Sequence, residues 1–421
     1  MKKFLLFLFS FSFLFAFDTL WFRVYDTEWG ELCYEIGIDP LGNVVISGET
    51  RYGILLLKYS PSGETIWSRI IDDEDRLYGA SLAIDKEGNM ILVGCYYREP
   101  ELGAYIFKCD NEGNILWSKK FTIDNGCALL GVICDDSNNI IVVGYYYNDE
   151  DEEDIILIKY SPNGDSIWAK RYDFGEPFER VARLTIDRDG NIIATGLTGS
   201  LIPCIYDLLT VKFYKNGDLI WASWINFKEQ DWGEETGIDS FNNIYVCGTC
   251  ADFEPYFLLL IKYNQDGDTI WTRFYENSLG LALSIDKLGN ILVTGYTVEN
   301  GIANTLLIKY SPFGETILSK RFNFSPGGEM WASDMVLIND SNYIYITGTF
   351  YDGRDDDIYL MKLLYYPAIS EKFSKKILST SDKAKEIYDI TGKKIKDLRR
   401  LKKGVYFFKD KYFKKVIILS H

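Results

Sequence analysis

The sequence repeats itself about every fifty residues, and this periodicity restricts the chain to a small set of folds. A phrase Gly-x-x-(Ile/Leu)-Trp starts at Gly63, Gly113, Gly164, Gly217 and Gly267, and a sixth copy from Gly314 to Leu318 lacks the Trp. A strand-like apolar segment ends at Gly48, Gly94, Gly144, Gly196, Gly248, Gly295 and Gly348. The apolar segment after each of these glycines ends at Lys58, Lys108, Lys159, Lys212, Lys262, Lys309 and Lys362. Such a period predicts units that bury their apolar faces against one another.

Each unit contains four short strand patterns. In the first unit they cover residues 32–38, 44–49, 53–59 and 65–72, separated by turns rich in Asp, Pro, Gly and Asn. Four strands in about fifty residues predict one blade of a β-propeller. We therefore expect an all-β fold: a seven-bladed β-propeller with four-stranded blades over residues 17–365.

The two ends of the repeat region complete each other. The last unit has strand patterns at 332–339, 343–349 and 357–363 but no fourth, whereas an extra strand pattern with Trp21 stands at the N-terminus. We expect residues 18–25 to pair with 357–363 and close the last blade. Closure would remove the exposed edges of an open sheet.

Two segments resemble the units of the bacterial β-propeller repeat family: Asp286 to Gly295 (DKLGNILVTG) and Leu307 to Gly314 (LIKYSPFG). The resemblance covers about residues 18–365. It implies the fold and an exported protein, and it implies no single activity.

The N-terminus has the pattern of a secretory signal peptide. Lys2 and Lys3 precede a mostly apolar run up to Phe17, with the small residue Ala16 near its end. We assign residues 1–16 to the signal, because a membrane span needs about 20 residues. We expect no transmembrane helix after signal removal, and an extracellular or outer-surface location.

The C-terminal part differs in charge from the rest. Residues 365–421 contain 16 Lys and Arg against 6 Asp and Glu, although the whole chain has a net charge of −16. We expect a linker over 366–384 and a small β-module over 385–421. The segments Tyr388 to Lys393 and Leu401 to Tyr406 resemble the C-terminal sorting domain of type nine secretion, which implies the secretion machinery as a partner. A basic module that docks on the acidic propeller is the alternative.

Charge and histidine content exclude several classes of function. The acidic balance argues against nucleic acid as a partner. The single histidine, His421, leaves no residue for Ser-His-Asp or Cys-His catalysis or for histidine-ligated zinc. Cys247 and Cys250 form a CxxC within a strand pattern, which we interpret as structural.

Aromatic and acidic residues gather where the first strand of each unit begins. These candidate ligand-binding residues are Trp29, Glu31, Tyr78, Asp231, Trp232, Glu234, Glu329 and Trp331. Aromatic faces beside carboxylates suit a glycan, and they also suit a cationic protein surface. The alternative is that the tryptophans pack between blades and the acids are solvated.

We expect no cofactor, and only one segment is a candidate for a metal. Asp149, Asp151 and Asp154 lie in an acidic loop that offers oxygen ligands for Ca²⁺, although the spacing is not that of an EF-hand. A solvated acidic loop is the alternative.

These features favour a non-catalytic, exported protein that binds a glycan or protein ligand. A secreted glycosidase or lyase with a carboxylate pair on the loop face is one alternative, and a purely structural surface protein is another. The repeated tryptophans should be buried between neighbouring blades. The repeated Asp and Lys of each unit, such as Asp39 and Lys58, should form structural pairs.

Overall fold

The computed structural model describes residues 17–27, 30–150, 152–200, 205–252, 255–324 and 328–366, together with short strands between 387 and 416. The expected signal peptide, Trp29, Asp151 and nearly all of the expected linker lie outside the described residues. The chain divides into two compact units, one of Leu20–Lys362 and one of Met1–Thr19 with Leu363–His421. All regular secondary structure among the described residues is β-strand.

Four sheets of the repeat region have four antiparallel strands each, as the repeats predict. Three of them follow chain order. They are β2 (Glu31–Ile38), β3 (Val44–Thr50), β4 (Gly53–Tyr59) and β5 (Thr65–Ile71); β6 (Arg76–Ile84), β7 (Met90–Arg98), β8 (Glu101–Cys109) and β9 (Ile115–Phe121); and β22 (Ser278–Ile285), β23 (Ile291–Glu299), β24 (Ile302–Tyr310) and β25 (Thr316–Phe322). The fourth has the order β1 (Phe17–Tyr25), β28 (Asp356–Tyr365), β27 (Tyr343–Tyr351) and β26 (Glu329–Ile338). The N-terminal strand thus lies beside β28, as expected.

The remaining strands form one 12-stranded sheet rather than three separate ones. Its strands are β10 (Cys127–Cys134), β11 (Ile140–Tyr147), β12 (Glu153–Tyr160), β13 (Ser166–Tyr172), β14 (Phe178–Ile186), β15 (Ile192–Ser200), β16 (Ile205–Phe213), β17 (Leu219–Ile225), β18 (Gln230–Ile238), β19 (Ile244–Ala251), β20 (Tyr256–Tyr263) and β21 (Thr269–Glu276). Only single parallel residue pairs, Glu153 with Phe178 and Tyr206 with Gln230, join its three four-stranded parts. The expectation of isolated four-stranded sheets is wrong at these two places, because the third strand of one unit touches the first strand of the next.

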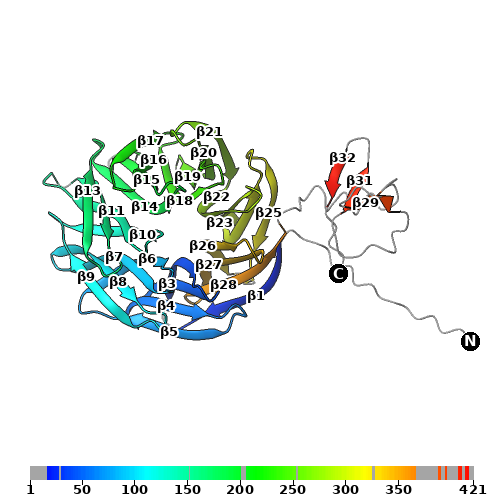
Figure 1. The fold of residues 1–421 in the computed structure, drawn as a ribbon. Coiled ribbons are helices and arrows are strands. Elements are labelled where there is room, and N and C mark those ends of the chain that lie inside the picture. The colour runs from blue at the N-terminus through cyan, green and yellow to red at the C-terminus, as the bar shows by residue number, and fades with distance from the viewer. Residues whose placement is uncertain are drawn as a thin grey trace, which may run out of the picture. The chain divides into compact units, whose positions relative to one another are not determined.

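The first strands of the units contact one another in a closed cycle. Going round the cycle, the order is β2, β6, β10, β14, β18, β22 and β26, and β26 contacts β2 again. Figure 1 shows these strands on the inside of the ring and strands such as β5, β9 and β13 on the outside. This arrangement is that of a β-propeller.

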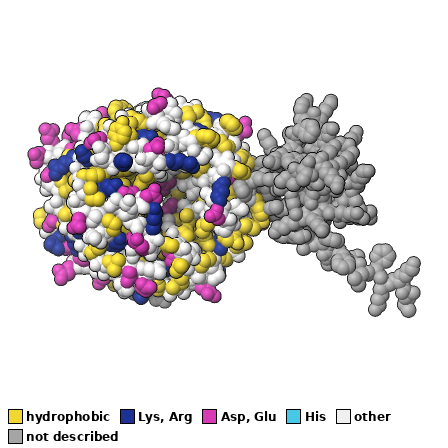
Figure 2. Space-filling model, viewed as in Figure 1, with side chains coloured by type: hydrophobic (Ala, Val, Ile, Leu, Met, Phe, Trp, Pro, Cys, Tyr) yellow, Lys and Arg dark blue, Asp and Glu magenta, His cyan; other side chains and the backbone are white. Residues whose placement is uncertain are grey.

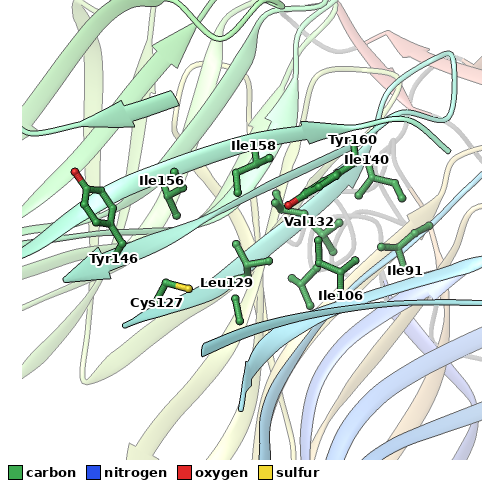
Figure 3. Close-up of a cluster of buried hydrophobic side chains, with 13 residues drawn as sticks. Ile91, Ile106, Cys127, Leu129, Val132, Ile140, Tyr146, Ile156, Ile158 and Tyr160 are labelled. Carbon is green, nitrogen blue, oxygen red and sulfur yellow. The ribbon is translucent and has the colours of Figure 1, made fainter. Parts of the chain in front are cut away.

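The apolar core lies between neighbouring sheets. Figure 3 shows one such layer, in which Ile91 and Ile106 of one sheet pack with Ile140 and Ile156 of the next. All four side chains are at most 2% exposed. Burying large aliphatic side chains on both sides of each sheet stabilises the ring, at about 25 cal/mol per Å² of apolar surface.

The repeated tryptophans lie against the following unit, but they are only half-buried. Trp168 in β13 packs on Gly217, where an added Cβ would be 2.9 Å from the indole ring. Gly217 has φ +87°, so both the backbone and the tryptophan require glycine there. The predicted packing between neighbouring units is observed, but the burial is partial because these tryptophans stand on the outermost strand of each sheet.

The repeated Asp and Lys form ion pairs within their units, as expected. Nζ of Lys58 is 2.8 Å from Asp39, and that of Lys212 is 3.0 Å from Asp187. Several of these lysines also donate to the next unit. Lys58 donates to the Asn111 carbonyl at 3.1 Å, and Lys362 donates to the Pro61 carbonyl at 2.8 Å, which links the last unit to the first.

In the C-terminal part the described residues form a small antiparallel sheet. Its order is β30 (Lys394–Ile395), β29 (Ile387–Asp389), β31 (Tyr406–Lys409) and β32 (Phe413–Val416). Among the described residues no helix is long and apolar enough to cross a membrane.

Candidate functional site

Two tiers of residues line the ring of first strands. Each first strand has a break in its pairing register beside the repeated glycine of the second strand, and this break sets apart two positions. The upper tier pairs with the residue after that glycine; its members are Leu32, Tyr78, Ala128, Arg180, Trp232, Leu279 and Trp331. The lower tier pairs with the residue before it; its members are Glu35, Ser81, Gly131, Arg183, Glu235, Ala282 and Asp334.

Part of the lower tier ties the first strands together. Glu35 accepts a hydrogen bond from the Leu82 N–H of the next unit at 2.7 Å. Asp334 likewise accepts from the Ile36 N–H at 3.0 Å, and Ser81 from the Val132 N–H at 3.2 Å. In each case a side chain of the preceding unit satisfies a backbone N–H of the next first strand.

The lower tier also concentrates charge. Arg183 forms an ion pair with Glu35, 148 residues away, and it is the one cation among the three carboxylates of the tier. Burial raises the pKa of Glu235 to about 8, and the charge of Asp334 adds to this while Arg183 opposes it. Burial also raises the pKa of Asp334. Figure 2 shows acidic and basic side chains around a hollow near the middle of the ring.

The upper tier combines aromatic rings with held polar groups. Trp232 donates its indole N–H to Glu234 at 2.7 Å, and burial raises the pKa of Glu234. Arg180 is bound to Glu153, with 2.6 Å between Nη2 and Oε1. Its guanidinium lies 4.3 Å from the centre of the Tyr145 ring. Half-buried aromatic faces beside fixed charges form a surface that can hold a polar ligand with apolar faces.

An open cavity of about 430 Å³ lies next to Leu32 of the upper tier. It is bounded by the loops that lead into β2 and β6, and Glu49, Tyr52, Asp73 and Arg76 contribute to its wall. Glu49 is fixed there, because Tyr34 donates its hydroxyl to it at 2.7 Å and Gly79 donates its N–H at 3.2 Å. The cavity therefore has rigid polar walls on the side nearest the ring.

The structure brings some of the sequence-predicted residues together and separates others. Tyr78, Trp232 and Trp331 occupy the upper tier, and Glu234 lies two residues beyond Trp232 on β18. Glu329 stands half-buried at the start of β26.

Glu31 and Asp231 do not belong to the surface on which we placed them, because both are fully buried. Asp231 accepts the N–H groups of Phe227 and Lys228, and Glu31 accepts from the Thr27 hydroxyl. Both acids therefore hold the loops that lead into their strands.

The sequence argument missed the charged residues of the lower tier: Glu35, Arg183, Glu235 and Asp334. A signal did exist. Glu35, Arg183 and Glu235 each stand four residues before the repeated Asp of their unit, where the other units have Ser, Gly, Ala or Met. Only some of the units carry a charged residue at this position of the repeat. Such an exception to the repeat is a signal that the position has a separate role.

The cysteines and the acidic loop take separate places. Cys247 and Cys250 are free thiols, fully buried in two different apolar clusters, so the CxxC is structural. Asp149 is exposed in its loop. Asp154 is buried on β12, where it meets Asp173 and Glu179.

Comparison with known proteins identifies the fold. No protein-family model matches the sequence, and no curated protein sequence matches it. A polysaccharide lyase of family PL25, an ulvan lyase solved with -[GlcA(1-4)Rha3S]- bound, is similar with a TM-score of 0.50 and 12% identity over 80% of this chain and 95% of that one. Drosophila Plexin A in complex with Semaphorin 1b gives a TM-score of 0.50 and 9% identity over 91% and 94%. The Dos1 propeller gives a TM-score of 0.49 and 9% identity over 78% and 77%. At such identities the likeness shows the fold alone, an all-β propeller.

Proposed function

We propose that the protein is an exported, seven-bladed propeller that binds a glycan, without catalysis, at the upper tier. One observation carries this proposal: three aromatic side chains from separate units, Tyr78, Trp232 and Trp331, stand at one register level of the ring, next to a tier rich in carboxylates. Sugars stack their apolar faces on aromatic rings, and their hydroxyl groups donate hydrogen bonds to carboxylates.

The closed cycle of first strands supports seven blades. Each of the seven strands in that cycle begins a four-stranded unit, and the last unit takes its outer strand from the N-terminus. Residues 1–16 would direct export, and the C-terminal module with its type nine resemblance would address the secretion machinery. The protein would then act at the outer cell surface or in the medium.

A secreted carbohydrate-active enzyme is the second candidate, because Glu234 and Glu235 have raised pKa values. Glu235, whose pKa is raised to about 8, keeps its proton near neutral pH and can therefore act as a general acid. The neighbouring Arg183 could stabilise a carboxylate of the substrate. We rank binding first because part of the lower tier is already committed to strand contacts.

A glycan array with the mature protein tests the proposal. Trp232→Ala and Trp331→Ala should each weaken binding to the recognised glycan by about two- to tenfold, since stacking on one aromatic ring is worth about 0.5–1.5 kcal/mol. Trp224→Ala is the matched control, because Trp224 is 54% exposed on the outer strand β17. Glycan binding that all three variants retain would refute the proposed surface.

Two further measurements separate the alternatives. Turnover of a bound polysaccharide that is lost in Glu235→Gln would establish the enzyme. Binding to a protein partner in place of every glycan would refute the ligand class. Cell fractionation with mass spectrometry of both termini tests export: we expect the mature chain to begin at Phe17 and to lie outside the cell.

A further inference from the structure

The buried acids at the junction of β12 and β14 lack a counter-charge. Asp154 on β12, Asp173 after β13 and Glu179 on β14 each offer a carboxylate oxygen, and these oxygens lie within 4.8 Å of one another. Asp154 and Glu179 are 4% and 0% exposed. In the described part of the chain none of the three acids forms an ion pair.

One carboxylate oxygen of Glu179 is buried without a hydrogen-bond partner among the described residues. Its Oε1 accepts the N–H groups of Phe174 at 2.8 Å and Glu176 at 3.2 Å. Its Oε2 is buried and has no hydrogen-bond partner among the described residues. A buried carboxylate oxygen without a donor costs free energy, so such an oxygen needs a proton or a cation.

The other two carboxylates are positioned from outside the cluster. Asp154 accepts a hydrogen bond from the Asn148 amide at 3.2 Å through Oδ2. Asp173 accepts from the Gly175 N–H at 2.7 Å through Oδ1 and is exposed to solvent. Tyr146 also hydrogen-bonds to Asp154, and the exposed Asp173 brings one carboxylate of the cluster into contact with solvent.

We propose that Asp154, Asp173 and Glu179 bind a divalent cation, Ca²⁺, between the third and fourth units. All three donors are carboxylate oxygens, the ligand type that Ca²⁺ prefers, and Ca²⁺ accepts them at 2.3–2.6 Å in irregular arrangements completed by water. Two oxygens about 2.4 Å from one ion are at most about 4.8 Å apart, so the observed separation suits one ion. The ion would connect two units whose strands pair directly at one parallel residue pair, Glu153 with Phe178.

Burial and the charges of Asp154 and Asp173 raise the pKa of Glu179 to about 7. The loop predicted from the sequence supplies one ligand, Asp154, whereas the other two come from the next connection and the next unit.

Titration of the full mature protein with Ca²⁺, measured by calorimetry, tests the site. Thermal melting in EDTA and in Ca²⁺ is the second measurement. Wild-type protein should bind one Ca²⁺ at this junction, and its melting temperature should rise with Ca²⁺ concentration. Glu179→Gln keeps the size of the side chain and should weaken Ca²⁺ affinity by at least about tenfold. Asp173→Asn, at an exposed position that folding does not require, should do the same. Tyr146, which hydrogen-bonds to Asp154, should sensitise the luminescence of bound Tb³⁺.

The matched control is Asp231→Asn. Asp231 begins the first strand of the next unit, where Asn226 stands in place of Asp173 and donates to Asp207 at 2.7 Å. This variant should keep wild-type affinity. Absence of Ca²⁺ binding at millimolar concentration in folded wild-type protein would overturn the proposal. So would binding that survives in both Glu179→Gln and Asp173→Asn but is lost in Glu31→Gln, since that places the ion beside Asp357.

Discussion

Two buried acids at the openings of first strands have opposite surroundings. Asp75, just before β6, accepts from Arg98 at 2.6 and 2.7 Å and from Lys120 at 2.7 Å. These hydrogen bonds lower the pKa of Asp75 to about 2. Glu179, at the start of β14, has only backbone donors and acidic neighbours, and burial raises its pKa to about 7.

The comparison shows that burial alone does not decide the state of a carboxylate. Both acids lie in the same kind of connection, from the outer strand of one unit to the inner strand of the next. The first has its counter-charge within the chain, so it is complete without a ligand. The second has none in the described residues, so it needs a proton or an ion from outside.

Removing the cations around Asp75 should make the first junction resemble the second. The double variant Arg98→Ala/Lys120→Ala should lower the melting temperature by about 5 °C, because it leaves a buried carboxylate without partners. Thermal melts at neutral pH measure this, with Arg69→Ala on the outer strand β5 as a control. If the double variant melts like wild type, solvent alone stabilises the charge of Asp75 and the prediction is wrong.

Acid should weaken the Asp75 junction in a defined range. A lowered folded-state pKa means that the stabilisation is present above about pH 4 and is lost as the pH falls toward 2. Asp75→Asn should therefore lower the melting temperature by about 3 °C at pH 7 and by almost nothing near pH 2. An equal loss at both pH values would contradict the assignment.

A cation can also be transferred to the second junction. Asp173→Lys should place an ammonium beside Asp154 and Glu179, as Lys120 stands beside Asp75. In EDTA the melting temperature should rise by about 2 °C, and Ca²⁺ should no longer raise it. Asp165→Lys, an exposed acid in the turn before β13, is the control and should keep the Ca²⁺ response. A lower melting temperature for Asp173→Lys in EDTA would contradict this prediction.

The lower tier lies between these two extremes, with one arginine for three carboxylates. Because the pKa of Glu235 is raised to about 8 in the folded protein, its contribution to stability is full below about pH 4.5 and is lost as the pH rises through 8. Glu235→Gln should therefore flatten the decline of stability between pH 5 and 8. Denaturant unfolding at several pH values measures this. If Arg183 already compensates the charge of Glu235, the free energy of unfolding of the variant will depend on pH as that of wild type does.

The fold was predictable because its signals are local. Glycine, asparagine, lysine and tryptophan recur at fixed spacing, and each acts on its own turn or on the adjacent unit, as Trp168 does on Gly217. The site was only partly predictable, because its contacts join distant units. Nothing near Glu35 in the sequence indicates Arg183, and nothing near Asp154 indicates Glu179; the curvature of the ring brings them together.

The bond from Lys362 to the Pro61 carbonyl has a consequence for how the molecule opens. In a linear array of repeats the terminal units have one neighbour each and fray first. In the ring every unit has a neighbour on both sides, and Lys362 contacts the first unit as Lys58, Lys108 and Lys262 contact the units that follow them. Amide hydrogen exchange should therefore be slow and nearly uniform among the inner strands, and any cut in one connection should create the weak ends that the intact chain lacks.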